Sequence, residues 1–512
     1  MSYGNISTKF NISEYLMQTC NLKKGKGDNI AIYGKKRNFT YSEVEKKVNQ
    51  YAHFLVSLQI DIEQRIGILL PDMPEYIFLM LGAMKAGMVV VLINCKMRLD
   101  DIGYIIQESR MKYLFTEKDM CLQLSQDKFP HLSDIIPIDD TLLYKIEGFE
   151  STFEVVDTVG DDIALWIYTS GSSGKPKGAM HRHYDMLISS EFYGRKVLNI
   201  DENDVVYSHS KLSFAFGLGN SLYHPFAAGA SVILNDDEDL FSIPEILKKF
   251  KPTLFFSVPV VYKWLLKMVN VMDVDFDGVR LCVSAGEALP KEICTAWLEV
   301  FGCEVLQGFG STEMLHITLS NRLDGNKPGS AGTPVPGYSV KLLDENNQII
   351  TEPGTVGELY VAGGSIMAGF WHNYAENAQV LSLGGIKTGD MFYMDEDGYF
   401  WFVGRNSDTF KMNGKWVSAS QIEGVILSFP FIKEAAVSGE FTQAETTAIV
   451  AYLVGDNINI GVIEDIKKDV RINVNREFCP KKFYIVDHIP KGPTGKVLRS
   501  KIGEVTIINT LY

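Results

Sequence analysis

The sequence has few of the features that mark secreted, zinc-binding or nucleic-acid-binding proteins. Its 512 residues include 7 cysteines, an odd number without a Cys-x-x-Cys pair, so neither a disulfide framework nor a zinc ribbon is expected. The 49 basic side chains are outnumbered by 63 acidic ones, which gives a net charge of −14. This balance argues against a nucleic-acid-binding face, although a local basic groove can still bind an anionic ligand.

Long apolar runs are also missing. The most apolar window, residues 76–93, is interrupted by Lys85 and two glycines. It predicts a buried helix followed by a buried strand instead of a membrane span. The N-terminal residues have no basic region followed by an apolar core, so no signal peptide is evident. We therefore expect a cytoplasmic protein that has no membrane and no nucleic acid among its partners.

What the chain contains instead is a repeated alternation of strand and helix patterns. Thr40 and Glu43 have the spacing of a capping box and predict a helix start. Strands that alternate with helices indicate the α/β class, with mainly parallel sheets flanked by helices. The predicted strands span residues 28–34, 65–70, 88–93, 163–168, 253–258 and 279–284, and the predicted helices span 74–85, 242–250 and 260–269.

Further along the chain the pattern changes. Short strands at 338–343 and 357–361 alternate with turns and predict a small antiparallel β unit. The composition then turns polar before a compact α+β tail. Because the length exceeds that of one ordinary domain, we predict an N-terminal domain of residues 1–404 and a C-terminal domain of residues 405–512.

One loop carries the densest set of phosphate-binding groups. Residues 168–179 hold three glycines, four serine or threonine hydroxyls and two lysines directly after a predicted buried strand. Glycines let backbone N–H groups face a ligand, and the side chains add further donors. The loop is not a Walker A motif, because Pro176 stands where that motif needs its last glycine. A flexible Gly/Ser connection is the alternative. The candidate phosphate ligands are Thr169, Ser170, Gly171, Ser172, Ser173, Gly174, Lys175 and Lys177.

This loop resembles the phosphate loop of the adenylate-forming superfamily, which includes acyl-CoA synthetases, luciferases and peptide-synthetase adenylation domains. The resemblance covers nearly the whole chain and implies a large N-terminal domain joined to a small mobile C-terminal domain. It also implies that ATP and a carboxylic acid react to give an acyl-adenylate and pyrophosphate. Because two anions must meet, such a site needs Mg²⁺, a cation at the attacked phosphorus and anchors for the nucleotide.

A second glycine loop, residues 308–313, follows a predicted strand at 304–306. It is not a dinucleotide fingerprint, because Glu313 stands where the last glycine belongs. By resemblance Thr312 donates a hydrogen bond to phosphate and Glu313 binds Mg²⁺, which takes one carboxylate together with phosphate oxygens. An exposed loop glutamate is the alternative, as is an ordinary βα turn for residues 284–287. The residues that the resemblance assigns to adenine and ribose are Ser284, Ala285, Gly286, Glu287, Gly308 and Phe309.

Motifs nearer the C-terminus complete the resemblance. It implies that Asp390 accepts hydrogen bonds from the ribose hydroxyls and that Arg405 contacts ribose or phosphate. Lys496 matches the lysine that reaches the carboxylate and α-phosphate while the adenylate forms, a role that suits a compact charge on a long side chain. A solvated basic tail is the alternative. The pivot of the domain rotation falls on Ser407, where the superfamily usually has Asp or Lys.

Residues 211–221 and 311–317 are similar to benzoate-CoA ligases in particular. They imply a flat pocket that suits an aromatic ring. His224 stands where those ligases have an aromatic or aliphatic residue. Without a polar substituent on the substrate, its imidazole would lack a partner at a cost of about 1–3 kcal/mol, so we expect a hydroxylated benzoate, 4-hydroxybenzoate first. A backbone carbonyl as the partner of His224 is the alternative. The implied pocket residues are Ala215, Phe216, His224, Gly310, His316 and Ile317.

The leading hypothesis is therefore an ATP-dependent aryl-acid ligase that passes the aryl group to coenzyme A. Transfer to the phosphopantetheine of an acyl carrier protein is a second hypothesis, because both acceptors end in the same thiol arm. A non-catalytic nucleotide sensor is a third. The oligomeric state is left open, with a homodimer as one expectation.

Overall fold

The computed structural model describes residues 9–170, 175–237, 239–382, 384–412, 415–441, 447–491, 497 and 499–511. The chain forms two compact units. Unit 1 comprises Met1–Thr169, Pro176–Val340 and Val361–Ile386, and unit 2 comprises Ser170–Lys175, Lys341–Tyr360 and Lys387–Tyr512. Among the described helices, none is long and apolar enough to cross a membrane.

The first sheet of unit 1 has seven strands in the order β19-β8-β7-β4-β3-β5-β6. The neighbouring strands from β7 through β4, β3 and β5 to β6 are parallel, and β19 is antiparallel to β8. The strands are β3 (Arg65–Leu69), β4 (Val89–Leu92), β5 (Tyr113–Thr116), β6 (Asp134–Pro137), β7 (Ile163–Ser170), β8 (Pro176–Arg182) and β19 (Gly369–Phe370). The helices that accompany them are α2 (Tyr41–Ser57), α3 (Pro74–Lys85), α4 (Leu99–Ser109), α5 (Lys118–Gln123), α6 (Asp140–Glu147), α7 (His183–Ser189) and α13 (Tyr374–Val380).

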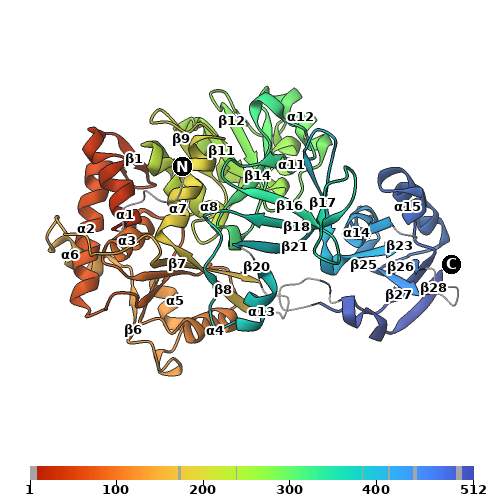
Figure 1. Ribbon diagram of the computed structural model, residues 1–512, viewed down its shortest axis with the longest axis horizontal. Helices are drawn as coiled ribbons and strands as arrows, with labels where there is room; N and C mark the ends of the chain where they lie inside the picture. Colours follow the sequence, from red (N-terminus) through yellow and green to blue (C-terminus); the bar gives the residue numbers. More distant parts are fainter. Residues whose placement is uncertain are drawn as a thin grey trace. The chain divides into compact units, whose positions relative to one another are not determined.

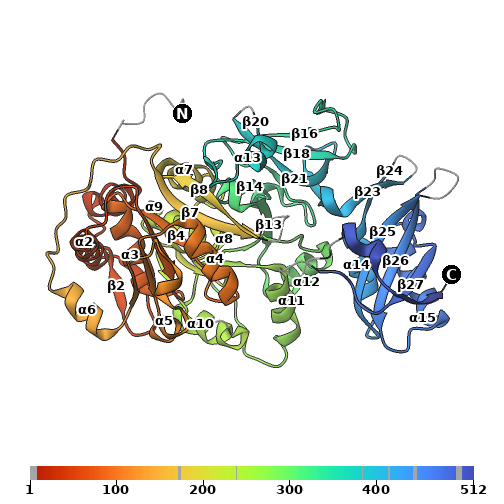
Figure 2. The same ribbon diagram turned by 90° about the horizontal axis from the view of Figure 1, so that it is seen from below.

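Helices α2 and α3 lie side by side (Figures 1 and 2). The predicted capping box starts α2: the Glu43 amide donates to Thr40 Oγ1 at 3.3 Å, and the Thr40 amide donates to Glu43 Oε2 at 2.9 Å. In α3 the residues from Tyr76 onward are buried, and Lys85 at its end is satisfied by Glu45 Oε1 at 2.6 Å. The apolar window is thus a buried helix followed by the buried strand β4, as predicted.

The second sheet of unit 1 has nine strands in the order β15-β14-β13-β12-β11-β9-β10-β1-β2. Its middle, from β13 to β1, is parallel. The strands are β1 (Ile30–Tyr33), β2 (Asn38–Thr40), β9 (Val205–Ser208), β10 (Ser231–Ile233), β11 (Leu254–Ser257), β12 (Leu281–Ser284), β13 (Val305–Gly310), β14 (Ile317–Ser320) and β15 (Thr333–Pro334). The helices between them include α8 (Ala215–Leu218), α9 (His224–Ala228), α10 (Ile243–Phe250), α11 (Pro259–Met268) and α12 (Lys291–Phe301), and two π-helical turns are η5 (Ser190–Arg195) and η6 (Gly219–Tyr223).

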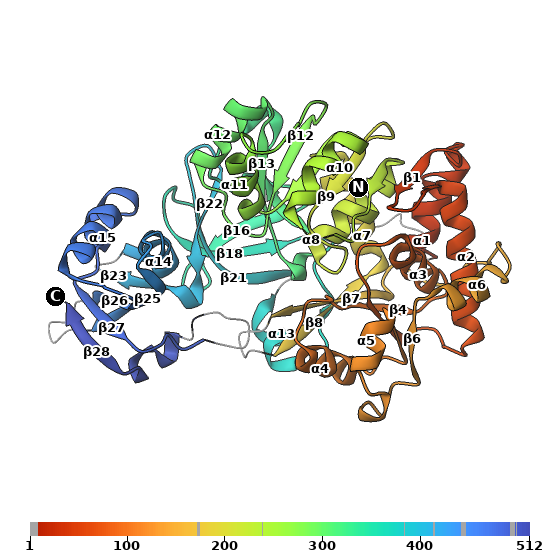
Figure 3. The same ribbon diagram turned by 180° about the vertical axis from the view of Figure 1, so that it is seen from behind.

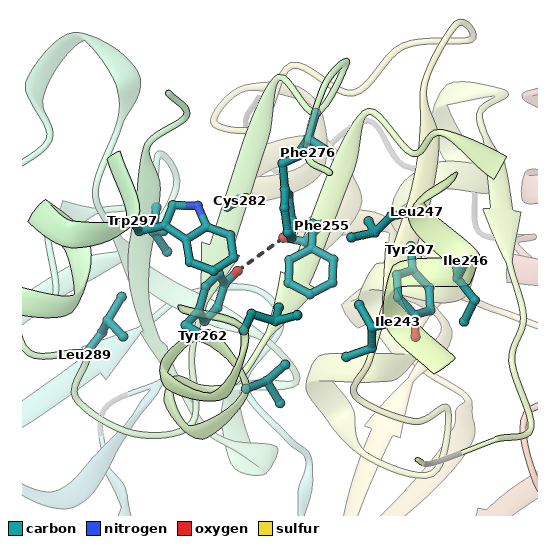
Figure 4. Close-up of a cluster of buried hydrophobic side chains, with 14 of the residues drawn as sticks. Tyr207, Ile243, Ile246, Leu247, Phe255, Tyr262, Phe276, Cys282, Leu289 and Trp297 are labelled. Atoms are coloured by element: carbon teal, nitrogen blue, oxygen red, sulfur yellow. Dashed lines mark hydrogen bonds between the residues drawn. The ribbon is translucent and has the colours of Figure 1, made fainter. Parts of the chain in front are cut away.

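An aromatic core joins α11 and α12 to this second sheet (Figure 4). The ring of Trp297 meets those of Tyr262 and Phe276 edge to face, each at 4.8 Å between centroids. The buried Tyr262 hydroxyl donates to the carbonyl of Val283 at 2.8 Å. Edge-to-face pairs add about 0.5–1.5 kcal/mol each beyond the area they bury, so this core fixes β11, β12 and their helices as a rigid support.

Unit 2, seen from behind in Figure 3, holds antiparallel strand pairs together with helices, and its strands β26 and β27 pair in parallel. Strands β17-β16-β18-β21 are neighbours, β22 pairs with β21, and β25-β26-β27-β28 form a separate sheet. The strands are β16 (Ser339–Leu343), β17 (Ile349–Ile350), β18 (Gly357–Ala362), β21 (Gly385–Met394), β22 (Phe400–Arg405), β23 (Thr409–Met412), β24 (Lys415–Ser418), β25 (Ile432–Phe441), β26 (Thr447–Gly455), β27 (Lys482–Val486) and β28 (Ile507–Leu511), and the helices are α14 (Ala419–Leu427) and α15 (Ile460–Asn473).

The α/β class and the antiparallel β unit are confirmed, and the predicted helices and strands differ from the observed ones only at their ends. The two units do not follow the predicted boundary, because unit 2 already includes Lys341–Tyr360 and begins its last segment at Lys387. The division near residue 404 therefore stays a prediction.

Candidate functional site

The carboxyl ends of the parallel strands in the second sheet carry hydroxyl side chains. Ser257 ends β11 and Ser284 ends β12, and the two are register partners. Both side chains are fully buried, and their Oγ atoms have no hydrogen-bond partner among the described residues. Because buried polar groups are normally paired and ligands of such sheets bind beyond the strand ends, these hydroxyls point to a ligand site. Ser284 was among the predicted site residues, but Ser257 was not. The one sequence signal for Ser257 is its position at the end of a predicted strand.

The turn after β12 contains a glycine in a conformation that favours glycine. Ala285 is buried, whereas Gly286 and Glu287 are exposed. Gly286 has a φ of +91°, a left-handed conformation that favours glycine. The turn therefore leads away from the core directly beyond the Ser284 hydroxyl.

The predicted second glycine loop lies where β13 turns into β14. The pairing of these strands is irregular at Gly310, where a Cβ would lie 2.2 Å from the carbonyl oxygen of His316. Only glycine fits this close approach. Gly308 similarly leaves room for the side chain of Ile317, which would lie 2.7 Å from a Cβ there.

Thr312 and Glu313 are fixed through their backbones. His181 Nε2 bonds the Thr312 carbonyl at 2.8 Å, and its Nδ1 faces Asp185 Oδ2 at 3.0 Å. The Glu313 carbonyl accepts from the Met367 amide at 2.9 Å. The carboxylate of Glu313 is half-exposed and can reach a ligand. The buried His181–Asp185 pair was missed, because nothing in its local pattern points to residue 312.

The predicted phosphate loop is described at its two ends. Thr169 and Ser170 complete β7, and Lys175 is exposed. Lys177 forms an ion pair with Glu376, and its side chain is only 9% exposed. In this conformation its ammonium is already neutralised, so its role at phosphate stays a prediction. Four of the predicted ligands lie outside the described residues: Gly171, Ser172, Ser173 and Gly174.

His316 lies in a buried cluster of rings. Its Nε2 lies 3.2 Å from both the Phe216 carbonyl and Asn220 Oδ1. Because a carbonyl only accepts, Nε2 carries the proton and Nδ1 is the acceptor. Nδ1 has no partner within the described part of the chain. Burial lowers the pKa of His316 to about 3, so the imidazole is neutral.

His224 extends this cluster. Its ring lies 4.4 Å from that of His316, with an angle of 77° between the planes. Its Nε2 is 3.0 Å from Ser189 Oγ, so its partner is a side-chain hydroxyl and not the backbone carbonyl that the sequence left open. Its Nδ1 has no partner in the described ranges. Burial, helped by the nearby His316, holds the pKa of His224 well below its usual range.

The six predicted pocket residues are therefore neighbours in unit 1. The rings of Phe216 and His316 lie 5.5 Å apart, and Ala215 is buried at the start of α8. Gly219 brings η6 against His316, because a Cβ there would lie 2.4 Å from its Cδ2. Ser189 and Asn220, the two polar partners of the imidazoles, were not among the predicted pocket residues, although Asn220 lies within the stretch 211–221.

In unit 2 the predicted ribose ligands meet each other. Asp390 and Arg405 are register partners on β21 and β22, and Arg405 Nε lies 2.9 Å from Asp390 Oδ1. The aspartate is 2% exposed and the arginine side chain 51%. A buried carboxylate thus has a charged partner that can turn toward solvent or toward an anionic ligand.

The predicted pivot lies beside a charged network. Ser407 Oγ donates to Asp408 Oδ1 at 3.2 Å, and Asp408 also pairs with Arg499 Nε at 3.1 Å. Arg499 donates through both terminal nitrogens to Glu423, at 2.5 and 2.9 Å. The network was missed, because its members are far apart in sequence. Lys496, the predicted catalytic lysine, lies outside the described residues.

Comparison with known proteins decides the family. A model described as AMP-binding enzyme matches residues 21–371, and one described as AMP-binding enzyme C-terminal domain matches residues 421–496. The chain belongs to the AMP-binding enzyme family. The predicted adenylate-forming resemblance is thus confirmed.

Individual relatives narrow this assignment. The benzoate–CoA ligase of Thauera aromatica is 32% identical over 97% of this chain and 96% of its own. The 4-hydroxybenzoate–CoA/benzoate–CoA ligase of Rhodopseudomonas palustris is 32% identical over 95% and 93%. The crystal structure of the anthranilate CoA ligase AuaEII in complex with anthranoyl-AMP has a TM-score of 0.87 at 28% identity and covers 98% of both chains. The protein is an AMP-forming acid–thiol ligase of the benzoate-CoA ligase-like branch.

Proposed function

We propose that this ligase adenylates an aromatic carboxylic acid with ATP and transfers the aryl group to the thiol of coenzyme A. The observation that carries the proposal is the cluster of the half-buried Phe216 with the buried His224 and His316, beside the β13–β14 turn. Flat aromatic walls favour an aromatic ring by dispersion and ring-face contact. The relatives named as ligases of benzoate, hydroxybenzoate and anthranilate agree with this choice.

In the first half-reaction a carboxylate oxygen attacks the α-phosphorus of ATP, and the bond to pyrophosphate breaks. The adenine and ribose would lie beyond β12 and β13, near Phe309 and the Ser284 hydroxyl, which has no partner among the described residues. For Asp390 and Arg405 we propose the ribose role that the resemblance implies. Lys496 would supply the positive charge between carboxylate and α-phosphate.

The residues present also fit a magnesium ion. No three His, Cys, Asp or Glu side chains gather in the described ranges as a site built from protein alone would require. Magnesium needs fewer protein ligands, because it keeps waters and binds phosphate oxygens. The half-exposed Glu313 carboxylate, held by its backbone bond to Met367, would serve as its protein ligand. When bound, the ion neutralises charge on the triphosphate.

In the second half-reaction the thiol sulfur attacks the acyl carbon, and AMP leaves. Rotation of the C-terminal domain about Ser407 would withdraw Lys496 and admit the thiol. Coenzyme A is proposed as the acceptor, because the relatives are named as its ligases; an acyl carrier protein would present the same thiol arm.

We propose 4-hydroxybenzoate as the preferred acid. His316 Nδ1 is an unpaired acceptor, and His224 Nδ1 is also without a partner among the described residues. The hydroxyl of 4-hydroxybenzoate can donate to His316 Nδ1, and it can accept from His224 Nδ1 when that nitrogen carries the proton. Benzoate has no hydroxyl and would leave both nitrogens unpaired, at a cost of about 1–3 kcal/mol each.

Acid-dependent exchange of pyrophosphate into ATP tests the adenylation step. We expect exchange with 4-hydroxybenzoate and none without an acid, and subsequent thioester formation with coenzyme A by mass spectrometry. Lys496→Ala should lose most of the exchange while ATP binding, measured by calorimetry, persists. Exchange that no aromatic acid stimulates would end the proposal and favour a nucleotide sensor. If the thioester forms only on an acyl carrier protein, that protein and not coenzyme A is the acceptor.

A further inference from the structure

Two thiols that the proposed reaction does not use lie in contact at the beginning of neighbouring strands. Cys282 is the second residue of β12, and Cys303 lies in the short connection that leads from α12 into β13. Their Sγ atoms are 3.7 Å apart. The two cysteines come from different elements, so this contact is a product of the tertiary fold.

The two thiols differ in exposure. Cys282 is fully buried against the aromatic core, and it is drawn with Trp297 in Figure 4. Cys303 is half-buried and can be reached from solvent. The indole Nε1 of Trp297 donates to Cys303 Sγ at 3.4 Å. A donated hydrogen bond stabilises a thiolate. The more exposed sulfur, that of Cys303, is therefore also the one whose thiolate is stabilised.

The acidities of the two groups follow this difference. The hydrogen bond from Cys282 lowers the pKa of Cys303 to about 7, against the opposing effect of burial and with help from Trp297. Burial raises the pKa of Cys282 well above its usual value. One member of the pair is thus a thiolate near neutral pH, and the other keeps its proton.

We propose that Cys303 and Cys282 form a peroxide-reactive pair, in which Cys303 is the reactive thiol and Cys282 the resolving thiol. The Cys303 thiolate attacks one oxygen of hydrogen peroxide, the O–O bond breaks, and the hydroxide that leaves takes a proton to become water. The product is a sulfenic acid. Cys282 sulfur then attacks the sulfenic sulfur and gives up its proton, the S–O bond breaks, and a second water leaves with a disulfide formed.

The local geometry allows the bond to close. The two sulfur atoms of a disulfide lie about 2.0 Å apart. The Sγ atoms of Cys282 and Cys303, which are 3.7 Å apart, must therefore move closer together for the bond to form. Cys303 lies outside strand and helix, next to Gly302, which has a φ of +69° and no atom within 4 Å of a Cβ position. Cys303 is therefore held by its contacts with Trp297 and Cys282 and not by the hydrogen bonds of a helix or strand.

Cys294 is the competing partner within the same region. It is buried on α12, and burial raises its pKa to about 11. A protonated, enclosed thiol reacts slowly with peroxide. The pair, and not Cys294, is therefore expected to be oxidised first.

Peptide mapping of the peroxide-treated full-length protein tests this assignment. Trypsin separates the two thiols, because cleavage after Arg280, Lys291 and Arg322 places them in peptides 281–291 and 292–322. After free thiols are blocked, we expect these two peptides to be joined with the loss of two hydrogen atoms, with fragment ions that assign the bond to Cys303. Dithiothreitol should reverse the joining.

Two variants separate the steps. Cys303→Ser should abolish the joined peptide. Cys282→Ser keeps a hydrogen-bond donor to Cys303 but cannot form a disulfide, so it should stop the reaction at a sulfenic acid that dimedone traps on Cys303. Cys479→Ser is the matched control, because Cys479 is also half-buried but burial raises its pKa; it should leave the joined peptide unchanged. Absence of the joined peptide in the wild type, a bond through Cys294, or no dimedone adduct in Cys282→Ser would each overturn the proposal.

Discussion

The imidazoles of His224 and His316 lie edge to face at 4.4 Å, and each leaves one ring nitrogen without a partner in the described part of the chain. These two neutral histidines therefore place two open ring nitrogens within a cluster of aromatic rings. Their other nitrogens are held by Ser189 and Asn220, so the rings are fixed in direction. If the proposed substrate enters this cluster, we expect it to be selected by what it offers to the two open nitrogens.

Replacement of His224 by phenylalanine should weaken the preference for a hydroxylated ring. We expect the ratio of kcat/KM for 4-hydroxybenzoate over benzoate to fall about ten-fold, because one polar partner worth roughly 1.4 kcal/mol is removed. Pyrophosphate release with both acids measures the ratio. Ser189→Ala is the companion variant, since it keeps the imidazole but frees its Nε2. If His224→Phe leaves the ratio of the two efficiencies at the wild-type value, the ring hydroxyl does not meet this residue.

Stability should fall in mild acid because several histidines are buried in their neutral form. Burial lowers the pKa of His183 and of His316 to about 3, against about 6.5 in an unfolded chain. His183 Nδ1 accepts from the Ile12 amide at 3.2 Å, which requires that nitrogen to be unprotonated. Above pH 6.5 both states are neutral and nothing changes. Below it only the unfolded chain takes up the proton, so each histidine removes about 1.4 kcal/mol of unfolding free energy per pH unit until the folded pKa is reached.

Urea unfolding followed by tryptophan fluorescence at pH 7.5, 6.5 and 5.5 measures this dependence. His183→Gln keeps an acceptor for Ile12 but cannot titrate, so its unfolding free energy should fall less steeply, by about 1.4 kcal/mol per unit. Parallel pH curves for the variant and the wild type would contradict a neutral buried His183.

Local patterns were sufficient for the elements and for part of the site. The capping box of Thr40 and Glu43 and the apolar window ending in β4 could be predicted, because their periodicity and spacing depend on near neighbours alone. The glycine loops were found for the same reason. Position 310 requires glycine because the backbone of His316, 6 residues further along the chain, passes close to it. A requirement of this kind is visible in the sequence as a glycine.

The partners of the site residues could not be predicted in this way. Ser189 is 35 residues from His224, and Arg499 is 91 residues from Asp408. Serine and arginine are ordinary surface residues unless the fold brings a partner to them. The Ser257 hydroxyl, which has no partner among the residues that the structure describes, shows the same limit. Ser257 and Ser284 become neighbours only when β11 and β12 pair.

An alanine at position 310 should disrupt the turn that positions Thr312. Its Cβ would lie 2.2 Å from the His316 carbonyl oxygen and 2.6 Å from its carbon, and backbone atoms cannot yield as a flexible side chain does. We expect Gly310→Ala to lower the free energy of unfolding by several kcal/mol, on the order of 3. Thermal unfolding and pyrophosphate exchange measure the loss.

Gly424→Ala is the matched control for that variant. It lies in α14 with nothing within 4 Å of its Cβ position, and alanine is favoured over glycine in a helix by about 1 kcal/mol. Its unfolding midpoint should be equal or higher. A Gly310→Ala protein with wild-type stability and exchange activity would mean that the close approach is not needed in solution.

Arg499 should contribute more to the stability of unit 2 than an exposed ion pair of that unit does. It donates to both oxygens of Glu423 and to the Val437 carbonyl, and it also pairs with Asp408 beside the predicted pivot. Side-chain exposure is 17% for Arg499 and 10% for Glu423, so its removal leaves a largely buried carboxylate without its charge partner, at a cost of about 3 kcal/mol. Lys411 is the matched control, because its pair with Glu345 is exposed and should contribute about 1 kcal/mol or less.

Hydrogen exchange of the full-length protein, read on peptides from α14 and β25, separates these two cases. Arg499→Ala should raise exchange in these elements by roughly 100-fold, as a loss of about 3 kcal/mol in local opening requires, whereas Lys411→Ala should change it little. Glu423→Gln should recover part of the loss when it is added to Arg499→Ala, because the unpaired charge is then removed. Equal exchange in Arg499→Ala and Lys411→Ala would show that the network does not hold α14 against β25, and that the residues after Lys496 are anchored by other contacts.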